Sequence, residues 1–109
     1  MSRRAEEEIK SISRFSTLML EKLAANRDKP HWSECDTDWL FERLHEEHVE
    51  LGEAVETYFT ALGRLNTRRG TDLEVWEAEQ AVRREAADVA NFAMMIAENL
   101  DRPRPEERN

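Results

Sequence analysis

Two pairs of carboxylates stand at helical spacing in this sequence, and together they could bind a divalent cation. Glu47 and Glu50 form the first pair, and Glu85 and Asp88 form the second. Residues three positions apart lie on the same face of a helix, so each pair can direct both carboxylates at one ion. Mg²⁺ prefers oxygen ligands and usually takes carboxylates together with substrate phosphates. The four residues therefore predict a Mg²⁺ site, which Mn²⁺ can also occupy.

Glu47 is the most unusual of these acids because it falls inside an apolar stripe. At about 100° per residue, it lies on the same helical face as four apolar residues. These are Leu40, Leu44, Leu51 and Tyr58. A lone buried carboxylate is costly unless it is paired, protonated or bound to a metal, so Glu47 needs a partner.

A later segment, AADVANFAMMIA at residues 86–97, is apolar except for Asp88 and Asn91. These two residues lie three apart, and Glu85 lies a further three residues upstream, so all three share one side of a helix. Polar side chains in register on an otherwise apolar helix indicate a shared buried site.

Other arrangements of the same residue types are open. A structural network of hydrogen bonds or ion pairs would join the acids to Arg43 or Arg84 without a metal. Glu42 and His45 have the spacing of a carboxylate-bridged di-iron site, but such bundles need a second Glu-x-x-His pair. The sequence has no second pair, so an iron site is not expected.

Three long helices are predicted to carry these residues. Apolar residues recur at three and four positions over about residues 4–26 and 38–65, and again from Thr71 to about Asp101. Residues 1–101 are thus predicted to form a single all-α domain, an antiparallel bundle of three main helices. Residues 102–109 are predicted to form a flexible C-terminal tail.

The expected helix ends follow from local chemistry. Pro30 disfavours helical geometry in the residue before it and ends the first helix. Asp36 or Thr37 is the expected N-cap of the second helix. Thr71 and Glu74 have the spacing of a capping box at the start of the third helix.

Composition limits the partners. The 109 residues carry a formal charge of −8, which argues against nucleic acid because phosphate neutralisation needs clustered cations. A single cysteine, an acidic N-terminal segment and the lack of an apolar run of about 18 residues predict a cytoplasmic protein without membrane contact.

The pattern Glu46-Glu47-x-x-Glu50, followed by Glu85-x-x-Asp88 on a later helix, resembles the MazG-like all-α nucleoside-triphosphate pyrophosphohydrolases. The similarity extends through RLHEEHVEL and EAADVAN and covers most of the chain. The segment NRDKPHW is also similar to the segment that precedes this helix in some members. The resemblance implies that Glu47, Glu50, Glu85 and Asp88 are the Mg²⁺ ligands.

The resemblance also implies an activity, the hydrolysis of an NTP or dNTP to the monophosphate and pyrophosphate, often to remove non-standard or surplus nucleotides. Glu46 and Glu47 would be the catalytic carboxylates, with Glu46 outside the ligand set or orienting water, and Asn91 would contact the nucleotide. The alternative is a catalytically silent helical interaction module on the same scaffold. The intact set of four carboxylates favours the enzyme, because a silent protein has no need of buried acids.

Three residues before the second helix are further candidates for substrate binding. Trp32 could stack on a nucleobase beside Asn26 and Lys29, or pack as a staple against the start of the second helix. Lys29, or an arginine such as Arg84, could neutralise phosphate; a solvated surface lysine is the alternative.

Self-association is expected from the apolar residues that three helices cannot cover together. These are Phe59, Trp76, Phe92, Met94 and Met95. We expect a homodimer whose interface completes a four-helix bundle, or a homotetramer built from two such dimers.

Overall fold

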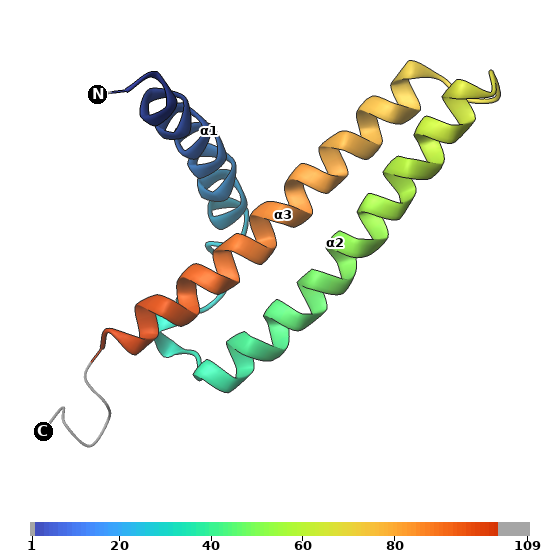
Figure 1. Cartoon of the computed structure of the whole chain (residues 1–109). Helices are drawn as coiled ribbons and strands as arrows, with labels where there is room; N and C mark the ends of the chain where they lie inside the picture. The colour runs from blue at the N-terminus through green and yellow to red at the C-terminus, as the bar shows by residue number, and fades with distance from the viewer. Residues whose placement is uncertain (1, 103–109) are drawn as a thin grey trace, which may run out of the picture.

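The chain is all-helical in the part that the structure, a computed structural model, describes, which is residues 2–102. Its helices are α1 (Arg3–Ala25), α2 (Thr37–Asn66) and α3 (Asp72–Leu100), with a 3-10 turn η1 (Trp32–Glu34) before α2. Figure 1 shows their arrangement. The predicted all-α fold is confirmed, and the helix boundaries fall close to the expected ones. Of the predicted tail, residues 103–109 lie outside the described residues.

Local caps define two of the helix starts. The Ser2 hydroxyl accepts a hydrogen bond from the Ala5 amide (3.1 Å), and the Thr71 hydroxyl accepts one from the Glu74 amide (3.1 Å). The Glu74 carboxylate contacts Arg64 (3.2 Å) instead of returning to the Thr71 amide. Thr71 is therefore the N-cap that was predicted, but the described contacts hold only half of the capping box.

Helices α2 and α3 form an antiparallel hairpin, which is the main packing unit of the chain. Near the turn that joins them, the buried residues Ala61, Val75 and Ala78 form a core cluster. Small side chains at Ala61 and Ala78 let the two backbones approach, and larger residues close around them. These partly buried residues are Tyr58, Leu62 and Leu65.

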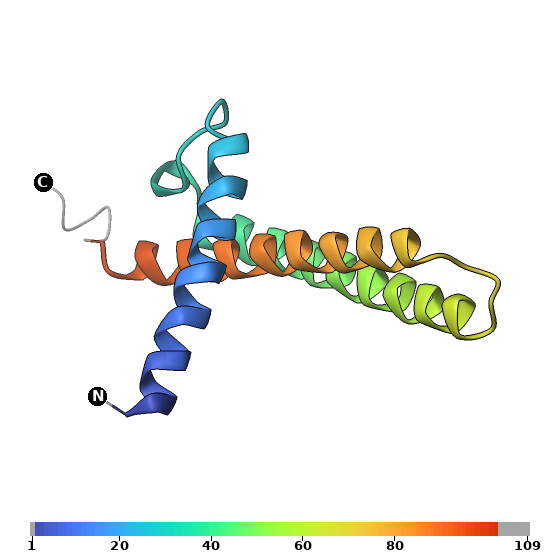
Figure 2. The ribbon, with the colours of Figure 1, turned by 90° about the horizontal axis from the view of Figure 1, so that it is seen from above.

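Helix α1 does not lie alongside the hairpin as a third antiparallel helix. It crosses α3 steeply, as the two perpendicular views in Figures 1 and 2 show, and none of its residues is buried. Its second half packs on α3, where the Asn91 side-chain amide donates a hydrogen bond to the Met19 carbonyl (3.1 Å). The first half, which includes the exposed Ile9 and Ile12, extends away from the hairpin.

The connector between α1 and α2 is held against the end of α3. Asn99 donates hydrogen bonds from its side-chain amide to the carbonyls of Trp32 (3.0 Å) and Cys35 (3.2 Å). Asp36 is the N-cap residue of α2, as predicted, although its side chain makes no capping hydrogen bond. Two asparagines of α3 thus anchor the N-terminal third of the chain, Asn91 on α1 and Asn99 on the connector.

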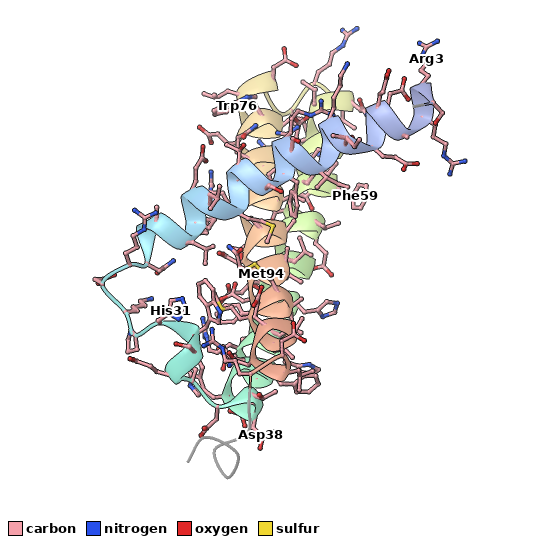
Figure 3. All side chains as sticks on the ribbon, turned by 90° about the vertical axis from the view of Figure 1, so that its left-hand side faces the viewer. Arg3, His31, Asp38, Phe59, Trp76 and Met94 are labelled. Atoms are coloured by element: carbon pink, nitrogen blue, oxygen red, sulfur yellow. The ribbon has the colours of Figure 1, made fainter. Side chains whose placement is uncertain are left out.

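The molecule is extended for its length. Its radius of gyration is 17.8 Å, whereas a compact domain of this size has roughly 13 Å. Phe59 and Trp76 extend from the hairpin into solvent (Figure 3) and are 63% and 56% exposed. Within residues 2–102, no helix combines the length and apolar character needed to cross a membrane.

Candidate metal centre

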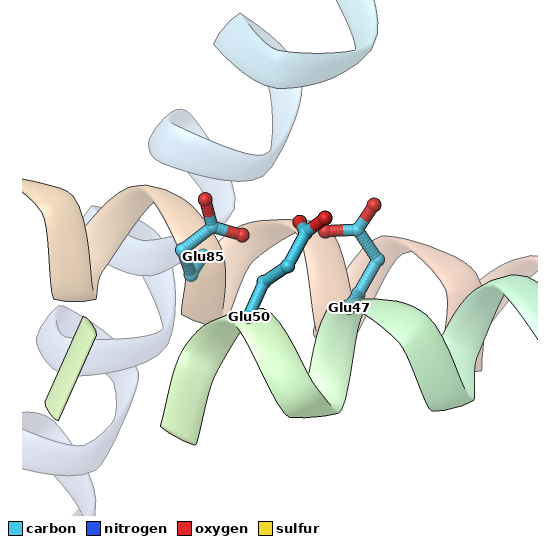
Figure 4. Close-up of side chains that lie close together, drawn as sticks. All are labelled: Glu47, Glu50 and Glu85. Carbon is cyan, nitrogen blue, oxygen red and sulfur yellow. The ribbon is translucent and has the colours of Figure 1, made fainter. Parts of the chain in front are cut away.

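Three carboxylates from two helices meet on one side of the hairpin. Glu47 and Glu50 extend from α2 and Glu85 extends from α3, and one oxygen of each lies within 4.8 Å of the others. Figure 4 shows the three carboxylates turned toward one another between the helices. The spacing of three residues places Glu47 and Glu50 on one face, and the antiparallel partner brings Glu85 to it. The predicted convergence of the two motifs is present for these three residues.

Burial differs across the cluster in a way that suits an ion. Glu47 is 5% exposed, Glu85 is half-buried and Glu50 is exposed, so the cluster is open to solvent on the Glu50 side. One oxygen of Glu47 (Oε2) and one of Glu85 (Oε2) are buried without a hydrogen-bond partner in the described structure. Buried polar atoms are rarely left without a partner, and an unpaired carboxylate oxygen is especially costly. An all-oxygen donor set with two unpartnered buried oxygens fits Mg²⁺ or Mn²⁺.

Arg43 supplies part of the ion-pair network that the sequence suggests as an alternative to a metal site. Its Nη2 donates to Glu47 Oε1 (2.9 Å), its Nη1 contacts Glu46, and its guanidinium lies over the Phe92 ring, 5.5 Å from the ring centre. Arg84 makes no ion pair among the residues described. One guanidinium satisfies one oxygen of Glu47 and leaves the unpartnered oxygens of Glu47 and Glu85 as they were. The network therefore explains the orientation of Glu47 better than it explains the cluster.

The electrostatics of the cluster favour protonation of Glu47 when no metal is bound. The pKa of Glu47 is raised from 4.5 to about 7, and burial is the largest cause. The neighbouring Glu50 carboxylate and the negative charge of Asp88 act in the same direction as burial, and Arg43 opposes them. A bound cation would favour the carboxylate form, so protons and metal compete for this residue.

Glu85 has the same tendency. Its pKa is raised mainly by burial, then by the negative charges of Glu50 and Asp88, whereas the neighbouring Glu47 acts in the opposite direction. The raised pKa values show that the negative charges of Glu47 and Glu85 are unfavourable in the cluster. A positively charged partner would therefore stabilise their carboxylate forms.

Asp88 lies next to the three carboxylates but is not one of the converging group. Its charge acts on both Glu47 and Glu85, and its Oδ2 lies 3.3 Å from Lys22 Nζ on α1. The sequence analysis did not single out Lys22. Its only signal is that it lies three residues after Met19, on the face of α1 that packs on α3.

The two residues predicted to support catalysis and nucleotide contact have other partners in the structure. Glu46 is exposed and pairs with Arg43, so it lies outside the converging group. Asn91 is 3% exposed and its amide nitrogen is used by Met19, while its Oδ1 is buried without a partner. The roles given to Glu46 and Asn91 stay predictions.

The remaining candidates lie at the end of α1 and in the connector. Asn26 is the C-cap residue of α1 and donates its side-chain amide to the Lys22 carbonyl (2.9 Å). Lys29 is exposed. Trp32 is half-buried, stacks near His31 with ring centres 3.9 Å apart, and has a buried Nε1 without a partner. None of these three belongs to the carboxylate cluster, and their contact with a substrate stays a prediction.

Asn99 is a further residue that the sequence analysis missed. It holds the connector through two carbonyls, and it lies three helical turns after Asp88, on the same side of α3. That register could have marked it as a continuation of the polar face formed by Glu85 and Asp88.

Comparison with known proteins does not assign a family. The chain matches no family model, no curated protein and no solved structure.

Proposed function

We propose that this chain is a Mg²⁺-dependent nucleoside-triphosphate pyrophosphohydrolase, which converts an NTP or dNTP and water to the monophosphate and pyrophosphate. The observation that carries the proposal is the meeting of Glu47, Glu50 and Glu85 with two buried oxygens unpartnered. The resemblance of the two acidic motifs to MazG-like enzymes supports the same assignment. We further propose that the protein acts in the cytoplasm to remove non-standard or surplus nucleotides.

The ligand assignment follows from the positions of the acids. Glu47, Glu50 and Glu85 would hold the metal, with Asp88 as the fourth ligand after it exchanges its contact with Lys22. Mg²⁺ held there would neutralise phosphate charge and lower the pKa of an attacking water. Mn²⁺ would substitute because it accepts the same oxygen ligands.

The chain's own groups then orient the reaction. The hydrogen bond from Arg43 would fix Glu47 Oε1 and leave the buried Oε2 free for the metal. Glu46, on the other nitrogen of Arg43, would orient the water. The nucleoside would contact the residues of α1, the connector and α3 that the sequence predicted. These are Asn26, Lys29, Trp32 and Asn91.

Attack at the α-phosphorus is the favoured route. Hydrolysis at the γ-phosphorus usually employs a Gly-x-x-x-x-Gly-Lys loop that surrounds the terminal phosphates, and this sequence has none. The carboxylates of Glu47, Glu50 and Glu85 would instead hold an ion able to bind the phosphate chain. Water attack at the α-phosphorus would break its bond to the bridging oxygen and release pyrophosphate.

The competing proposal is a catalytically silent helical interaction module. Such a protein would be more stable with apolar residues in place of Glu47 and Glu85, because each buried acid is costly without a partner. The unpartnered oxygens therefore favour the enzyme.

Product analysis tests the proposed reaction. A panel of canonical and modified NTPs and dNTPs is incubated with Mg²⁺, and the products are separated by chromatography. We expect monophosphate and pyrophosphate, and loss of turnover with EDTA. Diphosphate with orthophosphate, or no turnover of any substrate, would contradict the proposal.

Self-association is part of the same proposal. The extended shape, the exposed Phe59 and Trp76, and an α1 without any buried residue leave large apolar surfaces uncovered. A second copy of the chain, which presents the same surfaces, would complete a four-helix bundle from two α2–α3 hairpins, and two such dimers would form a tetramer. Light scattering should show a dimer or tetramer at micromolar concentration; a stable monomer would contradict this.

A further inference from the structure

We propose that Lys22 is the residue that binds the substrate's phosphate chain, and that Asp88 holds it in readiness at the edge of the carboxylate cluster. The inference deepens the proposed function and rests on it. It gives α1 a part in the site that the acidic motifs on α2 and α3 do not assign.

The position of Lys22 is the first argument. Its Nζ lies 3.3 Å from Asp88 Oδ2, and the two side chains are only 28% and 19% exposed. Asp88 acts electrostatically on both Glu47 and Glu85, so Lys22 is linked to the cluster through Asp88. Figure 2 shows that α1 crosses α3 rather than lying along it, and the crossing brings one lysine of α1 to the acids.

The backbone around Lys22 is anchored, which is the second argument. The Asn91 amide donates to the Met19 carbonyl one turn before Lys22, and the Asn26 amide donates to the Lys22 carbonyl one turn after it. Asn91 is nearly fully buried, so the contact between α1 and α3 is specific at this point. A side chain on an anchored backbone can meet a ligand without first ordering the helix, which lowers the cost of binding.

Lys22 is also the cation on α1 that an ion pair joins to an acid of the predicted ligand set, whereas Lys29 and Arg84 make no ion pair with those acids in the described structure. Arg43 is the only other cation that contacts the acids of the site within residues 2–102, and both of its terminal nitrogens are used by Glu46 and Glu47. Four further arginines pair with acids of their own helix or of the hairpin turn, away from the cluster. These are Arg3, Arg4, Arg64 and Arg83.

The chemistry of lysine suits the task. An ammonium group has three donors, and the ion pair with Asp88 is the one contact with an acceptor that Lys22 makes in the described structure. The remaining donors can meet phosphate oxygens, to which lysine binds as a compact point charge. When the acids bind a cation, Asp88 would exchange its ion pair with Lys22 for the metal. The Lys22 ammonium group would then be free to bind the phosphates of the substrate. Lys22 therefore selects substrates that carry a phosphate chain over monophosphates.

Calorimetry with inorganic tripolyphosphate tests the role directly. The full chain is titrated with tripolyphosphate in the presence of Mn²⁺, as wild type, as Lys22→Met and as Lys10→Met, which removes an exposed lysine of the same helix. We expect Lys22→Met to weaken tripolyphosphate binding by about 10- to 100-fold, since a hydrogen bond to a charged group is lost. Lys10→Met should bind as wild type, and Lys22→Arg should recover most of the affinity.

Two further readouts separate ligand binding from a structural role. Mn²⁺ titrated alone, and a nucleoside monophosphate titrated with Mn²⁺, should bind Lys22→Met at least as tightly as wild type, because Asp88 is then free of its pair with Lys22. The inference is overturned, while the proposed function stands, in either of two cases. In the first, Lys22→Met weakens the binding of Mn²⁺ and of the monophosphate together with that of tripolyphosphate. In the second, Lys22→Met binds tripolyphosphate as tightly as wild type. If the wild type binds no tripolyphosphate with Mn²⁺, the proposed function fails as well.

Discussion

The two halves of the α2–α3 hairpin are built from the same two helices but bury different side chains. In the half near the turn, Ala61, Val75 and Ala78 form an apolar core closed by larger hydrophobic side chains. In the other half, Leu40 and Ala87 are buried as well, but the carboxylates of Glu47, Glu50 and Glu85 also meet there. The apolar half gains stability from burial, whereas the acidic half bears the cost of desolvating its carboxylates.

This contrast bears on which part of the hairpin is functional. Local features of a well-folded chain agree with its fold, and the places where they disagree are usually functional. Glu47 in the middle of an apolar stripe is such a disagreement, and Arg43 compensates it only in part. We therefore propose that the apolar half is the structural frame and the acidic half the functional site.

The largest expected effect comes from removing one acid of the site. Glu47→Gln keeps the size of the side chain and can still accept the hydrogen bond from Arg43, but it lacks the charge that holds a cation. Turnover of the best nucleotide substrate should fall by about 100-fold or more, as measured in steady-state assays with Mg²⁺.

Glu53 provides the matched control for that substitution. It is an exposed glutamate of α2 outside the cluster, so Glu53→Gln should leave turnover within about twofold of wild type. Equal activity of Glu47→Gln and Glu53→Gln would show that the two halves of the hairpin do not differ in function.

The next effect is on stability and belongs to the apolar half. Val75→Ala removes two methyl groups from a buried position and should lower the free energy of unfolding by about 1–3 kcal/mol. Chemical denaturation at fixed protein concentration measures it, with the exposed Val49→Ala as control. The Mn²⁺ affinity of the acidic half should not change in Val75→Ala. A loss of that affinity would show that the two halves do not have separate roles in stability and metal binding.

The third effect is a pH dependence of stability in the metal-free protein. The pKa of Glu47 is raised from 4.5 to about 7, so the folded state binds more protons than the unfolded state between these values. The contribution is fully present below pH 4.5 and is lost as pH rises through about 7; the raised pKa of Glu85 acts in the same direction.

Comparison with Glu47→Gln isolates this contribution. In EDTA, wild type should lose stability relative to the variant as pH rises from 5 to 8, because glutamine cannot ionise. Melting temperatures whose difference is constant over that range would contradict the assigned burial of charge.

Much of the fold could be predicted because it is encoded locally. Apolar periodicity predicts the three helices, and the capping hydroxyl of Thr71 predicts the start of α3. The position of Glu47 within an apolar stripe predicted its burial, which is confirmed at 5% exposure. The spacing of Glu47, Glu50 and Glu85 likewise predicted their convergence, because an antiparallel hairpin brings facing positions together.

The parts that could not be predicted depend on how α1 crosses α3. Periodicity predicts which face of α1 is apolar but not the angle at which α1 packs on α3. The ion pair between Lys22 and Asp88 therefore could not be predicted from the sequence. For the same reason, Asn91 was assigned to a shared polar site, whereas its amide contacts the Met19 carbonyl. Contacts between distant helices need the tertiary arrangement.

Metal binding by the acidic half is the central claim, and a melting curve with added metal tests it most directly. Metal that binds the folded state stabilises it by about 2.7 kcal/mol at 100 times the dissociation constant. For a chain of this length, the melting temperature of wild type at pH 7.5 should rise by roughly 10 °C with saturating Mn²⁺ or Mg²⁺. Glu53→Gln should rise equally, and Glu47→Gln should not respond. Melting curves of wild type that do not move with millimolar Mn²⁺ or Mg²⁺, even with nucleotide present, would contradict the account.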